Sequence, residues 1–114
     1  MLKAQYHLRR KQDFQKIYRR GDYFFSPHLI IRFLPNSKNL SRFAFVVSAK
    51  VAPKAVDRNL VKRRLSEIIR LNLDHLAVGL DLIIIAKKSL LTQEFANQKE
   101  NLIILLKKAK ICQK

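Results

Sequence analysis

Apolar side chains return along this 114-residue chain at two different spacings, and each spacing predicts one kind of element. Between residues 11 and 20, Phe14, Ile17 and Tyr18 recur three and four positions apart, which predicts a helix. Gly21 follows at a place where helices commonly end. The chain therefore opens with a short amphipathic helix.

Two apolar runs rich in β-branched and aromatic residues follow, at residues 29–34 and 42–48, and both predict strands. Phe43, Phe45 and Val47 alternate along the second run, so they share one of its faces. Because only a short polar segment separates the two runs, we expect them to pair as a hairpin.

A basic helix and a buried strand come next. Pro53 interrupts the chain ahead of the helix, which we place at about residues 56–72. Residues 82–86 form an unbroken apolar run, typical of a strand buried on both faces. A strand, a helix and such a strand in succession predict a β-α-β unit with parallel pairing. We expect Asp81, which precedes the run, to fix a turn.

The last helix is predicted from an apolar stripe near the end of the chain. The stripe comprises Phe95, Leu102, Ile103, Leu106 and Ala109. We expect Thr92 to cap this helix, Glu94 to lie in its first turn and lysines to lie in its last turn, where their charge suits the helix dipole.

With an extra short strand near residues 23–25, the element order is α-β-β-(β)-α-β-α. This order predicts an α+β fold: a two-layer sandwich of a mixed, about four-stranded sheet with helices. Few glycines and prolines punctuate the chain and no linker is visible, so we expect residues 1–114 to form a single domain.

The net charge of the chain indicates the chemical class of its partner. The chain has 24 Lys and Arg against 8 Asp and Glu, a formal net charge of +16 at pH 7. Such self-repulsion favours a polyanion as partner, with nucleic acid ahead of an anionic membrane surface. No apolar run approaches the roughly 18 residues of a spanning helix, and the start of the chain lacks a signal-peptide core. The single cysteine, Cys112, can form no internal disulfide, so we expect a cytoplasmic protein.

The predicted basic helix has two different sides. On a helical wheel, Val61, Leu65 and Ile68 cluster on a side that should face the core. A different sector carries polar and basic residues: Arg58, Asn59, Lys62, Arg63, Ser66 and Arg70. Guanidinium groups match the geometry of phosphate oxygens, so this sector suits a polyanion. A merely solvated charged face is the common alternative, but the basic character of the whole chain weakens it.

Catalytic chemistry is not visible in the sequence. The three histidines lie far apart, with no Cys or carboxylate at ligand spacing, and there is no glycine-rich phosphate loop. The carboxylates are scattered, and we expect Asp57 and Glu67 on the basic helix to offset nearby arginines. We therefore expect no protein metal site and no protein-borne nuclease centre.

Residues 55–63, Ala-Val-Asp-Arg-Asn-Leu-Val-Lys-Arg, closely resemble the signature helix of the bacterial ribonuclease P protein component. Residues 13–21 resemble the family's first helix, residues 42–50 the strand before the signature and residues 81–88 the strand after it. The segments come in family order and near family spacing, in a chain of family length.

The resemblance implies the small basic subunit of a ribonucleoprotein that removes the 5′ leader from precursor tRNA. In such a particle the RNA subunit holds the active site, and Mg²⁺ is held mainly by RNA and substrate. The protein alone is expected to be inactive and to bind no cofactor. Its partners would be the catalytic RNA and precursor tRNA, with no membrane and no DNA. The resemblance also implies a left-handed β-α-β crossover through the basic helix, against the usual rule.

Two RNA-facing surfaces are implied as well. The signature helix would face the catalytic RNA through Arg58, Asn59, Lys62, Arg63, Arg64 and Arg70. A cleft between the first helix and the sheet would take the single-stranded leader through Phe14, Tyr18, Arg32 and Lys50. Further basic contacts are expected at Arg9, Arg10 and Lys11. Leu60 and Ser66 stand where the family usually has basic residues, which should weaken RNA contact locally.

Other readings remain open at this point. Phe14 and Tyr18 at helical spacing also suit a plain core, and Tyr18 is the better contact residue because its hydroxyl needs solvent or a polar partner. A ribosomal protein or a general RNA chaperone would share the charge and size without a dedicated leader cleft. A self-sufficient nuclease is disfavoured by the scattered carboxylates, and a membrane-surface protein by the ordinary core stripe of the basic helix.

Overall fold

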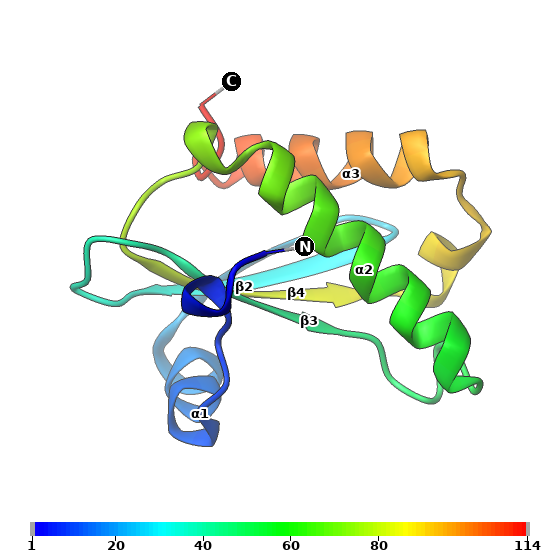
Figure 1. Cartoon of the computed structure of the whole chain (residues 1–114), viewed down its shortest axis with the longest axis horizontal. Coiled ribbons are helices and arrows are strands. Elements are labelled where there is room, and N and C mark those ends of the chain that lie inside the picture. The colour runs from blue at the N-terminus through cyan, green and yellow to red at the C-terminus, as the bar shows by residue number, and fades with distance from the viewer. Residues whose placement is uncertain (1, 114) are drawn as a thin grey trace.

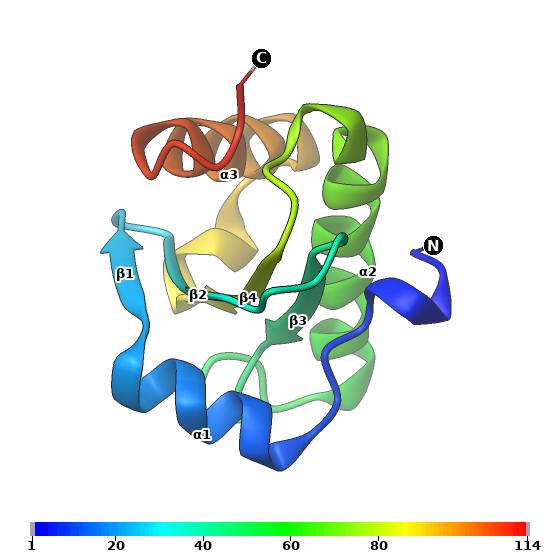
Figure 2. The same cartoon turned by 90° about the vertical axis from the view of Figure 1, so that its left-hand side faces the viewer.

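The computed structural model describes residues 2–113 and shows a four-stranded mixed sheet with helices on both faces (Figures 1 and 2). The main elements are α1 (Lys11–Arg20), β1 (Asp22–Phe25), β2 (Leu29–Pro35), β3 (Arg42–Val46), α2 (Ala55–Leu71), β4 (Leu80–Ala86) and α3 (Phe95–Lys108). Three 3₁₀ turns accompany them: η1 (Ala4–Tyr6), η2 (Leu73–His75) and η3 (Lys88–Thr92). The predicted α+β class and element order are confirmed, the extra strand included.

The strand order is β1-β2-β4-β3, with β2 antiparallel to both neighbours and β3 parallel to β4. The predicted hairpin between β2 and β3 is therefore wrong, because β4 lies between them. The reason is the apolar run of β4, which can be buried on both faces only at the centre of the sheet. The connection over residues 36–41 is long enough to cross the roughly 10 Å width of one intervening strand.

The helix α2 carries the chain between the parallel strands. In Figure 1 the β4 arrow points to the right, so the parallel strands β3 and β4 run away from the viewer in Figure 2. In Figure 2, β4 lies to the left of β3, and α2 connects them over the upper face of the sheet, which also carries α3. This crossover is left-handed, as the resemblance implied.

Helices cover the two faces of the sheet unequally. On one face, α2 and α3 pack over a core that includes Leu65, Leu82 and Leu102, all fully buried. On the other face, Ile17 of α1 packs against Ala44 and Ile83. The sheet with α2 and α3 forms the two predicted layers, and α1 adds a partial layer beneath one end of the strands (Figure 1).

Gly21 ends α1, as predicted, but the need for glycine here does not come from a left-handed backbone conformation. Its φ is −77°, and its N–H donates to the Ile17 carbonyl at 2.8 Å. A Cβ at this position would lie 2.6 Å from the carbonyl oxygens of both Ile17 and Phe33. The close approach of the helix end to β2 therefore requires glycine.

The start of α3 differs from the prediction. Glu94 occupies the N-cap position without a capping side-chain bond, and the Thr92 hydroxyl instead donates to the Ser89 carbonyl at 2.9 Å within η3. The cause is Leu90, fully buried, which anchors the 3₁₀ turn and delays the helix. Gln98 then ties α3 to this turn by donating to the Leu90 carbonyl at 3.0 Å.

Asp81 does not fix a turn, as the sequence suggested, but joins four parts of the chain. It lies in β4, opposite Arg42 of β3, whose Nε and Nη2 donate to its two carboxylate oxygens at 2.8 and 2.7 Å. Asn36, after β2, donates to the same carboxylate at 2.9 Å, and Arg42 lies 3.4 Å from Asp13 of α1. Donating these hydrogen bonds to the Asp81 carboxylate raises the pKa of Arg42.

Replacing Asp81 by Ala would leave Arg42, whose side chain is only 18% exposed, without its main partner. We expect the free energy of unfolding, measured by urea denaturation, to fall by about 3 kcal/mol. The matched control is Asp22→Ala, which removes an exposed carboxylate and should change it by less than about 0.5 kcal/mol. Equal losses in the two variants would contradict the role given to Asp81.

Candidate nucleic-acid interface

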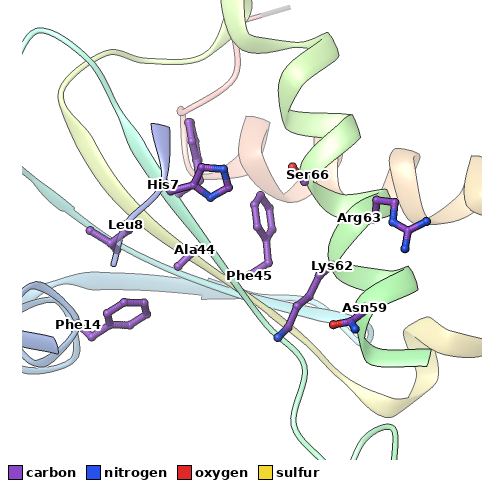
Figure 3. A pocket seen from close by; sticks show the side chains of 10 residues that line it. His7, Leu8, Phe14, Ala44, Phe45, Asn59, Lys62, Arg63 and Ser66 are labelled. Atoms are coloured by element: carbon purple, nitrogen blue, oxygen red, sulfur yellow. The ribbon is translucent and has the colours of Figure 1, made fainter. Parts of the chain in front are cut away.

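The outward side of α2 borders a cleft, and its other side is buried in the core. Val61, Leu65 and Ile68 are buried, as the helical wheel predicted. Asn59 and Arg63 are exposed and Lys62 is half-buried. Three of the predicted contact residues thus stand together on α2, above the edge strand β3 (Figure 3).

This opening, the helix cleft, has a volume of about 490 Å³. It is lined by His7, Leu8, Phe14, Phe43, Ala44, Phe45, Asn59, Lys62, Arg63 and Ser66. Figure 3 shows Leu8 and Phe14 facing the α2 side chains across β3. The β3 side chains and Phe14 make the cleft apolar inside, while α2 gives it a cationic rim. An apolar interior with a basic rim suits a nucleotide, whose base is flat and apolar on its faces and whose phosphate is anionic.

Ser66 belongs to the wall of this cleft and not to the solvent-facing sector expected for it. It is 6% exposed, and its Oγ makes no hydrogen bond within the part of the chain that the structure describes. The wheel misplaced Ser66 because its sector borders the core sector, and a short side chain there is covered by its neighbours.

Arg58, predicted to contact RNA, stabilises the loop that leads into α2. It is half-buried, and its Nη1 donates to the carbonyls of Ala52 and Pro53, both at 2.8 Å. These bonds hold the loop that ends at the helix start, so Arg58 has a structural task whatever else it contacts.

The other two arginines predicted on this helix do not line the helix cleft. The Arg64 guanidinium carbon lies 5.9 Å from the centroid of the Phe95 ring, in a shallow hollow that also includes Leu60. Arg70 is paired with Glu67, as expected for an offsetting carboxylate, and this hydrogen bond lowers the pKa of Glu67 and raises that of Arg70. The predicted contact set is therefore spread over more than one side of α2.

A second surface lies on the sheet face that α1 covers in part. Arg32 of β2 is half-buried, with its guanidinium carbon 4.9 Å from the Tyr18 ring centroid and 5.4 Å from that of Tyr23. Tyr18 is 46% exposed, while its neighbour Ile17 is the core residue of α1. Phe14 is half-buried and packs against the core beneath α1. The structure thus brings two of the predicted leader contacts, Tyr18 and Arg32, into direct contact.

The remaining predicted basic residues are exposed. Lys50 lies in the connection between β3 and α2, and Arg9, Arg10 and Lys11 lie at the start of α1. None of these four residues lines the helix cleft.

Two aromatic residues and a lysine on the second surface were not predicted from the sequence as contact residues. Tyr23 and Phe25 are 57% and 61% exposed, and their rings stack with centroids 6.4 Å apart. Lys87 Nζ lies 5.4 Å from the Phe25 ring centroid. The signal that could have found them is their two-residue spacing, which places both side chains on one face once residues 22–25 are recognised as a strand.

Residues 2–113 contain neither a metal-ligand cluster nor a membrane-spanning helix. No three His, Cys, Asp or Glu side chains gather there where they could hold a metal ion. No helix in the same residues has the length and apolar character needed to cross a membrane.

Comparison with known proteins gives consistent matches over most of the chain. The sequence model of the Ribonuclease P family matches residues 2–110. The ribonuclease P protein component of Clostridium botulinum (strain Langeland) is 39% identical over 105 residues, which is 91% of this chain and 94% of that protein. That of Streptococcus pneumoniae (strain Hungary19A-6) is 34% identical over 112 residues, 98% of this chain and 90% of the relative.

Solved structures agree with these sequence matches. The RNase P protein of Staphylococcus aureus superimposes with a TM-score of 0.88 at 28% identity, covering 96% of this chain and 99% of that protein. The RNase P protein of Thermotoga maritima gives a TM-score of 0.83 at 32% identity, covering 90% and 96%. Since the family's sequence pattern and its fold both extend over nearly all of these residues, the chain belongs to the ribonuclease P protein family.

Proposed function

We propose that this protein is the basic subunit of ribonuclease P and acts in tRNA 5′ maturation. It binds the catalytic RNA and the single-stranded 5′ leader of precursor tRNA, and so assists the magnesium-dependent endonucleolytic removal of the leader. Family membership supports the role, and the net charge of +16 supports RNA as the partner class.

The observation that carries this proposal is the position of α2. Its buried side is fixed on the sheet, so Asn59, Lys62 and Arg63 are held together at the rim of the helix cleft. Side chains fixed on a helix and not on a mobile loop can meet several phosphates of a folded RNA at once with little loss of entropy. We assign the catalytic RNA to this surface.

The leader is assigned to the second surface, around Tyr18 and Arg32. Exposed aromatic rings can stack on any base, and a guanidinium beside them can pair with the phosphates of the same strand. The direct contact between Tyr18 and Arg32 provides this combination at the edge of α1.

In this proposal the protein binds and orients RNA, while the RNA subunit carries out the cleavage. We assign the magnesium ions mainly to RNA and substrate, in keeping with membership of the ribonuclease P protein family. Every protein side chain named above acts by contact with phosphate or base, and none is assigned a proton transfer.

Reconstitution tests the proposal as a whole. Purified protein alone should leave precursor tRNA intact, while protein with ribonuclease P RNA should release the leader at the mature 5′ end at low magnesium. Cleavage by RNA-free protein after nuclease pretreatment would overturn the division of labour. Copurification with ribosomal RNA only, without stimulation of ribonuclease P RNA, would favour a ribosomal or chaperone role.

Lys62→Ala tests the α2 surface, because loss of one phosphate contact should weaken binding to the catalytic RNA and make its salt dependence shallower. The slope of log K against log salt should change by roughly 0.7 to 0.9. Lys99→Ala, an exposed lysine on α3, removes the same charge elsewhere and should leave the slope unchanged. The same slope change in both variants would show a general charge effect and refute a specific contact at Lys62.

Tyr18→Ala tests the leader surface. Loss of one stacked base should weaken binding of precursor tRNA to the holoenzyme by about 1–3 kcal/mol and leave mature tRNA, which has no leader, unaffected. Binding assays with both tRNAs and a thermal melt of the protein measure this. A lowered melting temperature with equal losses for both tRNAs would instead show that Tyr18 serves only packing.

A further inference from the structure

We propose that the leader site continues beyond Tyr18 and Arg32 to the edge of the sheet, where Tyr23 and Phe25 of β1 stack on further leader bases. This inference rests on the proposed function and adds the extent of the leader track. It is carried by the placement and exposure of the β1 aromatics and by the cations at either end of the pair.

The alternation of β1 separates its side chains by face. Tyr23 and Phe25 point to the face that carries Arg32, and Phe24 points to the opposite face, where it packs against the core under α3. Asp22 also alternates away from the Tyr23 face. The two exposed rings therefore form an aromatic patch that the neighbouring carboxylate does not share.

Cations flank this aromatic patch on both sides. The Arg32 guanidinium lies between the rings of Tyr18 and Tyr23, and Lys87 Nζ lies over Phe25. Lys87 is held there by donating to the Ser26 carbonyl at 2.8 Å. Aromatic rings that alternate with fixed cations match a single strand, in which bases alternate with phosphates.

An open strip of the sheet connects this patch to the rest of the molecule. Strand register places Phe25 beside Ile30, Ile30 beside Ile85, and Ile85 beside Val46. The three aliphatic side chains of this row are only half-buried, whereas Ile83, in the adjacent row under α1, is fully buried. The row crosses all four strands and ends at β3, so an extended strand of RNA could lie along it without displacing any element.

A second copy of this chain is the other candidate for an exposed aromatic patch on an edge strand. The net charge of +16 opposes such self-association, because two strongly cationic faces would meet. RNA gains from the same charge, so the occupant that we assign is the leader.

The test uses holoenzyme reconstituted with the double variant Y23L/F25L, which keeps apolar side chains and removes the rings. Precursor tRNAs with leaders of increasing length are titrated. Wild-type affinity should rise with leader length and then level off. The variant should level off at a shorter leader and lose about fivefold or more in affinity, only for leaders long enough to reach β1. Y23F and F25Y keep the rings and should retain the wild-type profile.

The matched control is Phe95→Leu, which removes an exposed ring beside Arg64, next to α2. Its effect should not depend on leader length. A second readout places 2-aminopurine at successive leader positions: wild-type holoenzyme should quench it by stacking at the positions over β1, and Y23L/F25L should restore its fluorescence there.

The outcomes separate the two proposals. A wild-type affinity that ignores leader length would defeat leader binding altogether. A length dependence that Y23L/F25L leaves intact, with unchanged quenching, would overturn the β1 extension alone. A wild-type dimer in sedimentation that the double variant converts to monomer would assign the patch to a second copy of the chain. A lowered melting temperature with equal losses at all leader lengths would show that the rings serve only stability.

Discussion

The arrangement of this protein depends on the burial of β4. Its strand is apolar on both sides, and residues 82–84 are inaccessible to solvent. Both faces of the central strand must therefore be covered, which requires α1 on one face and α2 with α3 on the other. Because β4 occupies the centre, β3 is left at an edge, and the α2 side chains that overhang it border a cleft and not a closed core.

Charge imposes the second constraint, because some of the few carboxylates are paired with arginines of the fold. Asp81 and Asp13 both lie against Arg42, and Glu67 is paired with Arg70. The Arg42 pairs neutralise a cation where α1, β3 and β4 meet, whereas Glu67 and Arg70 form an exposed pair within α2. Most of the excess positive charge therefore remains on the surface. An anion that binds only the folded state relieves the remaining repulsion and stabilises the fold by mass action. The RNA that we propose as partner would stabilise the folded state in this way.

The apolar periods of the sequence predicted α1 to α3 and β2 to β4, and β1 was expected only as an extra short strand. The sequence also predicted the parallel pairing of β3 with β4 across α2, but it did not predict the order of the whole sheet. The hairpin between β2 and β3 was favoured by the short connection, whereas the burial of β4 decides the actual order. The role of Asp81 could not be predicted from the sequence, because it depends on the strand register that places Arg42 opposite it.

The candidate site could be predicted in part. Asn59, Lys62 and Arg63 were identified from the α2 wheel and from the resemblance, and the structure places them together. The bracing role of Arg58 depends on loop carbonyls that no sequence period reveals. Tyr23 and Phe25 were passed over because β1 is short, and a four-residue strand gives too few alternations to indicate which side chains share a face.

The hand of the crossover decides which face of the sheet α2 covers and which face stays partly open. With β3 and β4 parallel and adjacent, the connecting helix must lie over one face or the other, and its hand follows from that choice. A right-handed connection would place α2 on the face of α1, over Ile85 and Val46. The left-handed connection places it on the opposite face with α3 (Figure 2). The side chains of that row are then only half-buried. The helix cleft and the open row then meet along β3, where Phe45 lines the cleft and the adjacent Val46 lies in the row. Two RNA strands held at these surfaces would therefore be separated by a single β-strand.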